Sequence, residues 1–234
     1  LRPLPYPDPD ALVRLYKTTL KQPERVGGTV SPPDFTDWRR DNSAFTEVAA
    51  YDSDSLALTG HGAAEVVRIG EVTGGFFTVL GTAPLYGRTI TTQDDPMGGR
   101  DVVVLGHDIW TRRFGSNPRI IGQTIQADGI SREVIGVMPP GVEFPLRSEL
   151  WIPLRFSARD LETQRGAHYI EVLGRLKPGV PIDAARAEMR TIGSRLAQEY
   201  PRTNRDHSVS VHPLRESLVG SVRQSMFVLL GAVG

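Results

Sequence analysis

The sequence predicts an α+β fold in which two strand–helix–strand halves flank an inserted unit of short mixed elements. Two observations support this prediction. Long elements with clear periodicity occur near both ends of the chain, whereas its middle contains short apolar runs separated by Gly, Pro and Asp. The hydrophobic fraction of 39% in 234 residues is sufficient for real cores. The two halves can therefore close into one split βαβ sheet with its helices on one face.

The first half begins after an extended lead-in, because four of the first ten residues are proline. Ser31 precedes Pro32 in the pattern of an N-cap followed by proline at the first helical position, and Asp34 occupies the capping-box place. The predicted elements of this half are a strand at 12–18, a helix at 34–42 and a strand at 47–58.

Three aspartates of that helix, Asp34, Asp37 and Asp41, lie away from its apolar face. We expect them to be solvated carboxylates, which are favoured near a helix N-terminus. A cation site is the alternative interpretation.

The middle of the chain is predicted to be a small mixed α/β unit. The run at 101–105 is almost continuously apolar, which indicates a strand buried on both faces. Asp128-Gly129 is the strongest signal for a two-residue hairpin in this chain. The predicted elements are strands at 65–72, 101–105, 125–127 and 131–137, and short helices at 75–81 and 107–114.

The second half contains the best helix, at 181–200, between strands at 168–176 and 208–214. Pro201 is expected to stop this helix. Its apolar residues recur at steps of three and four, which predicts one buried stripe: Ile182, Ala185, Met189, Ile192, Leu196 and Tyr200.

Charge and composition exclude several functional classes. The 27 basic residues are balanced by 27 acidic residues, so the electrostatic footprint of a nucleic-acid binder or a polybasic membrane-surface protein is missing. The absence of cysteine excludes a disulfide scaffold, a thiolate zinc site and a cysteine nucleophile.

A search for catalytic and ligand-binding patterns identifies no candidate catalytic, cofactor-binding or metal-binding residue. Phosphate-binding glycine loops and the Gly-x-Ser-x-Gly pattern are absent. Asp94-Asp95 is expected to form a turn, with calcium binding as the alternative. The five histidines are expected to be structural or surface residues, and none forms His-x-x-x-His: His61, His107, His168, His207 and His212.

The last nine residues, 226–234, carry no charge. A membrane-spanning helix needs about 20 apolar residues, so this run is interpreted as the first turns of such a helix. A buried C-terminal helix is the alternative interpretation.

Several segments, taken in order, resemble the extracytoplasmic domain of MacB-type ABC transporter permeases. The lead-in 1–7 and the segment 31–39 (Ser-Pro-Pro-Asp-Phe-Thr-Asp-Trp-Arg) are similar to the branch whose permease lacks a fused ATPase. The remaining matching blocks are 76–81 with 87–90, 102–106, Trp110, 113–115, 121–122, 134–139 and 176–180. Each block is weak alone, but their order and spacing are specific.

The resemblance implies a porter-like, ferredoxin-like subdomain and a Sabre-like insert. The first would comprise 1–58 and 160–225, the second 59–159, and 226–234 would begin a membrane helix. A further membrane helix is expected before Leu1.

The resemblance also implies the function of the domain. We expect a non-enzymatic extracytoplasmic domain of a permease in the bacterial inner (cell) membrane, of the efflux (antimicrobial-peptide or macrolide) or lipoprotein type. It would transmit ATP-driven motion of the membrane helices to the periplasmic side. The implied partners are a cytoplasmic ABC ATPase, a second permease copy and, as a further candidate, a periplasmic adaptor; no cofactor and no nucleic acid are implied. A periplasmic module that binds a peptide, lipid or drug is the alternative, and a secreted hydrolase is less favoured.

Overall fold

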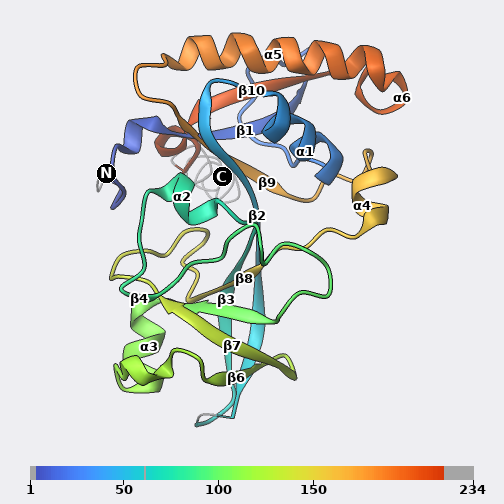
Figure 1. The fold of residues 1–234 in the computed structure, drawn as a ribbon. Helices are drawn as coiled ribbons and strands as arrows, with labels where there is room; N and C mark the ends of the chain where they lie inside the picture. The colour runs from blue at the N-terminus through green and yellow to red at the C-terminus, as the bar shows by residue number, and fades with distance from the viewer. Residues whose placement is uncertain (1–3, 61, 219–234) are drawn as a thin grey trace, which may run out of the picture. The chain divides into compact units, whose positions relative to one another are not determined.

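The computed structural model describes residues 4–60 and 62–218 (Figure 1). Contacts divide these residues into two units: unit 1 holds the chain up to Val48 and from Gln164 onward, and unit 2 holds Ala49–Thr163. The subdomain limits drawn from the sequence, 1–58 with 160–225 and 59–159, stay a prediction. The predicted start of a membrane helix at 226–234 lies outside the described residues.

Unit 1 is a split βαβ sheet with the strand order β10-β1-β9-β2. β1 lies between two antiparallel neighbours, with Val13 opposite Pro213 of β10 and opposite Gly174 of β9. The predicted α+β fold is therefore confirmed. The elements of this unit are η1 Pro9–Ala11, β1 Leu12–Thr19, α1 Pro32–Asp41, the start of β2 Phe45–Thr59, β9 Glu171–Leu176, α5 Ile182–Glu199, α6 Pro201–Asn204 and β10 His207–Pro213.

The start of α1 follows the predicted capping pattern. Ser31 is the N-cap, and its hydroxyl oxygen accepts a hydrogen bond from the backbone N–H of Asp34 at 3.4 Å. Pro32 occupies the first turn, where its missing N–H has no intrahelical partner to lose. The side chain of Asp34 makes a different set of contacts, which form part of the site below.

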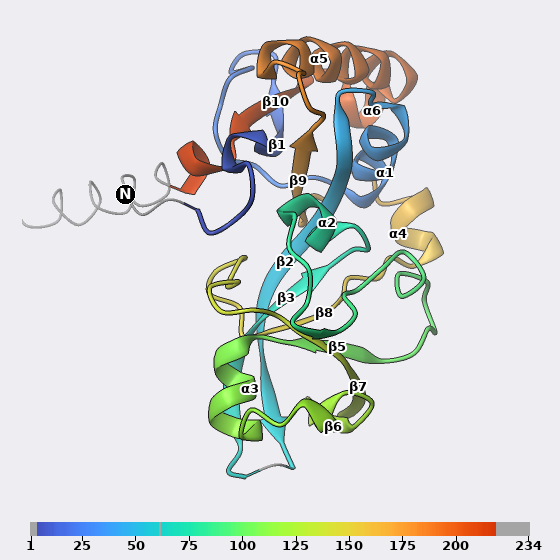
Figure 2. The ribbon, with the colours of Figure 1, turned by 60° about the vertical axis from the view of Figure 1, so that its left-hand side comes forward.

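α5 packs its apolar stripe against the sheet and lies next to α1 (Figure 2). Ala185, Met189, Ile192 and Leu196 are buried as predicted, whereas Ile182 and Tyr200 at the ends of the stripe are half-buried. α5 ends at Glu199, but Pro201 then starts α6, because proline is well tolerated in the first turn of a helix.

Unit 2 continues the sheet in the order β2-β3-β8-β5-β7-β4, with β6 paired to β2 and β7. β3 and β5 pair in parallel with β8 and β7 respectively, so the sheet is mixed. Its elements are the rest of β2, β3 Glu65–Val72, α2 Phe76–Leu80, β4 Tyr86–Gly87, β5 Val102–Leu105, α3 His107–Phe114, η2 Pro118–Ile120, β6 Thr124–Ala127, β7 Ile130–Val137, β8 Leu150–Pro153 and α4 Ala158–Glu162.

Asp128 and Gly129 join β6 to β7 with positive φ angles of 52° and 73°. These angles are those of the type I′ hairpin turn that the dipeptide predicted. The sequence analysis missed β4, β8 and α4. They are two, four and five residues long, too short for a periodic pattern to identify.

The sheet of unit 2 carries an aromatic cluster on one face. Trp151 packs edge-on against Phe77 at 5.6 Å between ring centroids, and its indole N–H donates to the carbonyl oxygen of Phe144 at 2.9 Å. Gly70 lies beneath it: a Cβ there would stand 2.7 Å from Cδ1 of Trp151 and 2.9 Å from Cδ of Pro145. The cluster therefore requires a residue without a side chain at this position of β3.

Replacing Gly70 with alanine should destabilise the protein by about 1–3 kcal/mol, because the added methyl group overpacks the cluster. Chemical denaturation of the variant measures this cost. Gly166→Ala is the matched control, since the nearest atom to its added Cβ would be 4.0 Å away. Equal stability of the two variants would contradict the packing argument.

Candidate functional site

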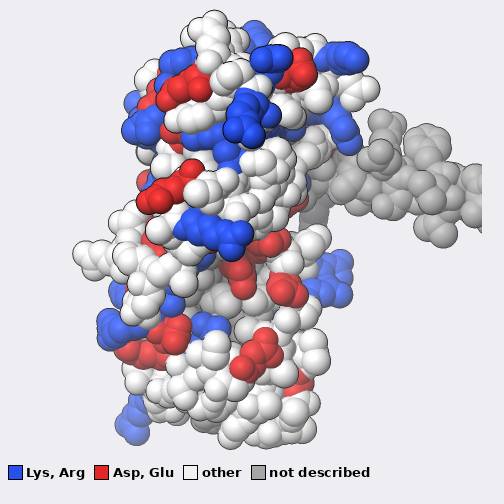
Figure 3. All heavy atoms as spheres, turned by 90° about the vertical axis from the view of Figure 1, so that its right-hand side faces the viewer, with Lys and Arg blue, Asp and Glu red and all other residues white. Residues whose placement is uncertain are grey.

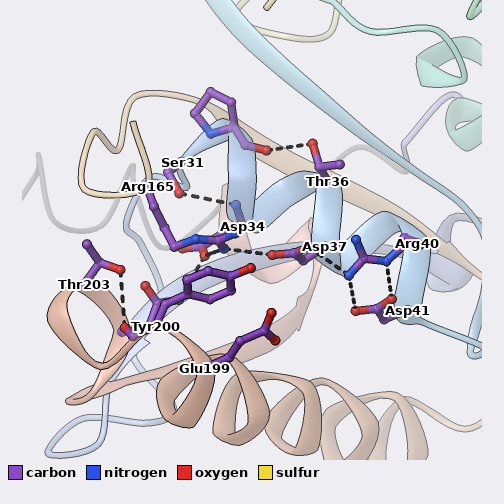
Figure 4. A network of polar contacts seen from close by, with 12 residues as sticks. Ser31, Asp34, Thr36, Asp37, Arg40, Asp41, Arg165, Glu199, Tyr200 and Thr203 are labelled. Atoms are coloured by element: carbon purple, nitrogen blue, oxygen red, sulfur yellow. Dashed lines mark hydrogen bonds and ion pairs between the residues drawn. The ribbon is translucent and has the colours of Figure 1, made fainter. Parts of the chain in front are cut away.

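A buried ion network in unit 1 joins β1 to α1. The side chains of Lys17 and Asp34 are 5% and 1% exposed, and Nζ of Lys17 donates to Oδ2 of Asp34 at 2.7 Å. Arg165, which precedes β9, donates to Oδ1 of Asp34 at 2.7 Å and forms an ion pair with Asp37 at 2.8 Å. Figure 4 shows Arg165 reaching between the two aspartates.

Asp34 is the centre of this network. The side-chain amide of Asn204 donates to its Oδ1 at 2.9 Å, so three side chains donate to one carboxylate. Burial acts to raise the pKa of Asp34, but the charge of Lys17 and the hydrogen bonds from Lys17, Asn204 and Arg165 outweigh it, and the pKa lies below its ordinary value. Asp34 therefore keeps its charge inside the protein.

His168 completes the surroundings of Lys17. Its Nε2 lies 2.9 Å from Nζ of Lys17, and because the ammonium group can only donate, this nitrogen accepts and the ring is neutral. Burial and the charge of Lys17 lower the pKa of His168. The third acceptor of the ammonium group is Oδ1 of Asn204 at 3.3 Å. All three protons of Lys17 thus have a partner.

The network extends to the end of α5. The guanidinium carbon of Arg165 lies 3.7 Å from the ring centroid of Tyr200, the residue between α5 and α6 (Figure 4). A stacked guanidinium gains cation–π attraction in addition to its ion pairs. Arg165 therefore attaches the segment leading into β9 to both α1 and the α5–α6 junction.

A small cavity adjoins the network. Its free volume of about 10 Å³ is that of a single water molecule, and it is lined by Lys17, Asp34, Trp38, Asn204 and His207 among others. Burial and the charge of Lys17 lower the pKa of His207. The cavity is suited to one buried water and is far too small for a drug-sized or peptide ligand.

The expectation that Asp34 and Asp37 are solvated is wrong. Asp34 is fully buried and Asp37 is 6% exposed, because α1 turns this side towards Lys17 and Arg165. Asp41 is partly exposed and pairs with Arg40 and Arg195. A signal existed in the sequence: Lys17 has the same strand parity as the apolar Val13 and Leu15, which places it on a face expected to be buried.

The structure also locates the other residues weighed in the sequence. His168 and His207 come together, with 6.1 Å between ring centroids; His107 lies beside Trp110, His212 beside Tyr16, and His61 is outside the described residues. Within the described chain, no group of three His, Asp or Glu side chains is arranged to hold a metal ion.

The Asp94-Asp95 segment forms the predicted turn. Asp94 accepts two hydrogen bonds from Arg88, at 2.7 and 2.9 Å, and one from the backbone N–H of Thr91. Asp95 accepts from the backbone N–H of Gly74 at 2.6 Å. Both carboxylates therefore hold loops of unit 2 in place. On the face drawn in Figure 3, basic and acidic side chains are interspersed.

The first and last strands of the described chain are neighbours in unit 1. β1 begins at Leu12, β10 ends at Pro213, and Val13 pairs with Pro213. After β10, the hydroxyl of Ser217 donates a hydrogen bond to the carbonyl oxygen of Pro213 at 3.2 Å. The start of β1 and the end of β10 are thus one strand spacing apart, about 5 Å. No helix within residues 4–60 and 62–218 is long and apolar enough to cross a membrane.

Comparison with known families identifies the domain type. Residues 3–192 match the model of the MacB-like periplasmic core domain. The chain belongs to this family. It is an extracytoplasmic domain of a MacB-like ABC transporter permease; such domains are non-catalytic, and membership of an ABC transporter implies an ATPase partner. No curated protein matches the sequence.

Three solved structures share the fold of this MacB-like domain. The extracellular domain of the noncanonical ABC-type transporter YknZ from Gram-positive bacteria is 17% identical, with a TM-score of 0.59 over 86% of this chain and 99% of that one. The periplasmic region of MacB from Actinobacillus actinomycetemcomitans is 16% identical, with a TM-score of 0.61 over 92% of both chains. A permease-protein domain from Porphyromonas gingivalis is 12% identical, with a TM-score of 0.64 over 89% and 93%.

Replacing Asp34 with asparagine should reduce the free energy of unfolding by about 3–5 kcal/mol, because Lys17 and Arg165 would remain buried without their shared counter-ion. Urea denaturation measures the loss. Asp41→Asn serves as the control: its ion pairs are partly exposed, and it should cost no more than about 1 kcal/mol. Adding Lys17→Met to Asp34→Asn should recover part of the loss; a purely additive double variant would refute the coupling.

Acidification should destabilise the protein, since the pKa values of His168, His207 and His212 are all lowered on folding. Well above pH 6.5, the ordinary pKa of histidine, these rings are neutral in both states. As the pH falls below that value, the unfolded chain binds protons that the folded protein does not, so stability is lost progressively. Denaturation at pH 7.5 and 5.5 tests this, and His168→Gln, which can still accept from Lys17, should weaken the dependence. An unchanged dependence in that variant would show that His168 does not contribute.

Proposed function

We propose that this MacB-like domain transmits ATP-driven motion of membrane helices to the extracytoplasmic side of a permease from the branch without a fused ATPase. The observation that carries the proposal is that β1 and β10, the first and last strands of the described chain, are neighbours. Because Val13 of β1 lies opposite Pro213 of β10, two membrane helices joined to these strands would act on one small area of unit 1.

A domain that passes on displacement has to deform little under load. Seven residue pairs connect β1 to β10, from Val13 with Pro213 to Thr19 with His207. The ion network holds β1 at Lys17, near the C-terminal end of the strand. It connects the strand to α1 and to the segment before β9. Buried charges that are fully paired resist rearrangement, because any movement would leave a charge without a partner in the low-dielectric interior. These features support a stiff base in unit 1.

The remaining parts of the proposal concern the assembly. The ATPase would be a separate cytoplasmic subunit, the permease would work as two copies, and a periplasmic adaptor is a further candidate partner. The domain would lie on the outer side of the bacterial inner (cell) membrane. The substrate would be of the efflux or lipoprotein type. Such motion would require that the assembly has two states and that nucleotide binds to them with different affinities.

Distances between the two copies in the full-length transporter test this proposal. Because residues 1–234 contain no cysteine, Ser194→Cys on the exposed side of α5 introduces a single spin-label site into this domain. We expect the distance distribution between labelled copies to shift when ATP is added together with the ATPase subunit. An identical distribution with and without ATP, in a transporter that hydrolyses ATP normally, would argue decisively against the proposal.

A further inference from the structure

The six residues before β1, 6–11, are folded against unit 1 and are termed the entry segment. The chain bends at residues 5–8, and η1 follows at Pro9–Ala11. Tyr6 is only 7% exposed. The first residues of a domain are commonly poorly ordered unless a contact ties them down. The burial of Tyr6 therefore indicates that the entry segment is attached to the fold.

Arg175 of β9 is the polar anchor of the entry segment. Its Nη2 donates to the carbonyl oxygen of Pro7 at 3.0 Å. Arg175 lies opposite Leu12, the first residue of β1, so its side chain reaches back past the start of that strand. Burial lowers the pKa of Arg175, whereas the negative charge of Asp8 acts in the opposite direction. A hydrogen bond and a charge thus hold the entry segment to β9.

The backbone of the entry segment has little freedom to bend. The rings of Pro7 and Pro9 fix φ at two of its six residues. The backbone N–H of Ala11 donates to the carbonyl oxygen of Asp8 at 3.0 Å, and the N–H of Leu12 donates to that of Pro9. Proline-rich segments are semi-rigid, whereas flexible linkers absorb displacement. The entry segment is therefore suited to passing a displacement on.

A displacement of the entry segment would reach two strands. The chain itself continues into β1 through Leu12, which is fully buried. The side chain of Arg175 connects Pro7 to β9, which lies between β1 and β2 in the sheet. The segment after β10 is also held, since Leu214 is fully buried and Ser217 is 3% exposed. Force applied ahead of β1 would thus enter the interior of the sheet as well as β1.

We propose that the entry segment is a stiff mechanical connector and that Arg175 is the positioning residue that holds it against β9. This inference rests on the proposed function and deepens it, because it names the residues through which displacement would enter unit 1. Without Arg175 the entry segment could pivot about the start of β1. Part of the displacement would then be lost in movement of the segment itself.

NMR relaxation of the chain of residues 1–234 tests whether Arg175 holds the entry segment. We expect backbone order parameters of about 0.85 for Tyr6 and Asp8 in the wild type, as in a rigid backbone, and below about 0.6 in Arg175→Met. Methionine keeps an unbranched apolar stem but removes the donor and the charge. Tyr6→Ala should release the segment in the same way. Each variant should unfold within about 4 °C of the wild type.

Arg186→Met is the matched control. Arg186 also donates to a backbone carbonyl oxygen, that of Val211 in β10, at 3.0 Å, but it makes no printed contact with the entry segment's anchor. This variant should leave the order parameters of Tyr6 and Asp8 at their wild-type values. Disorder of the entry segment in the wild type, or full order in Arg175→Met, would overturn the proposal.

The full-length transporter labelled at Ser194→Cys tests the mechanical role. In Arg175→Met the ATP-dependent shift in distance between the two copies should be at least about twofold smaller than in the wild type, at an unchanged rate of ATP hydrolysis. Arg186→Met should retain the whole shift. A shift of wild-type size in Arg175→Met would overturn the connector role. The absence of any shift in the wild type would instead refute the proposed function, while the relaxation data would still decide whether Arg175 holds the entry segment.

Discussion

The burial of one lysine beside one aspartate constrains much of unit 1. An ammonium group at the position of Lys17 is costly to remove from water unless it is fully paired, and Asp34 on α1 supplies the charge. The same carboxylate also accepts from Arg165 and Asn204, which lie before β9 and in α6. The positions of a strand, two helices and a connecting segment are therefore interdependent. None of them can shift without leaving a buried charge short of a partner.

The proposed transmission of motion would depend on this constraint through its place on β1. The strand begins beside the end of β10 and reaches the ion network at Lys17, which pairs with Val209. A displacement applied at the start of β1 and the end of β10 would thus be carried along these two hydrogen-bonded strands to the ion network at Lys17. Hydrogen bonds and buried ion pairs depend on direction, so they fix the positions of their partners more specifically than apolar packing does.

Unit 2 combines two different kinds of surface in one sheet. The interior of the sheet is apolar on both faces, with Trp151 and Phe77 on one and residues such as Val67 and Leu105 on the other. Strand β2 also carries two carboxylates, Asp52 and Asp54, that accept hydrogen bonds from the backbone N–H groups of Ser53 and Ser55. Apolar packing therefore stabilises the interior of this sheet, whereas the two carboxylates bond to backbone groups of their own strand.

Local sequence patterns were sufficient to predict the periodic elements and those bounded by clear turn or capping residues, such as α5, the Asp128-Gly129 hairpin and the Ser31-Pro32 helix start. Each depends on residues close together in the chain, and the order of its motifs was enough to indicate the family. Tertiary structure alone decided the environment of Asp34, since its partners Lys17, Arg165 and Asn204 are 17, 131 and 170 residues away. It also decided β8, whose four residues become a strand only between β3 and β5. Local pattern carries no information about charges and short strands whose partners are remote in the chain.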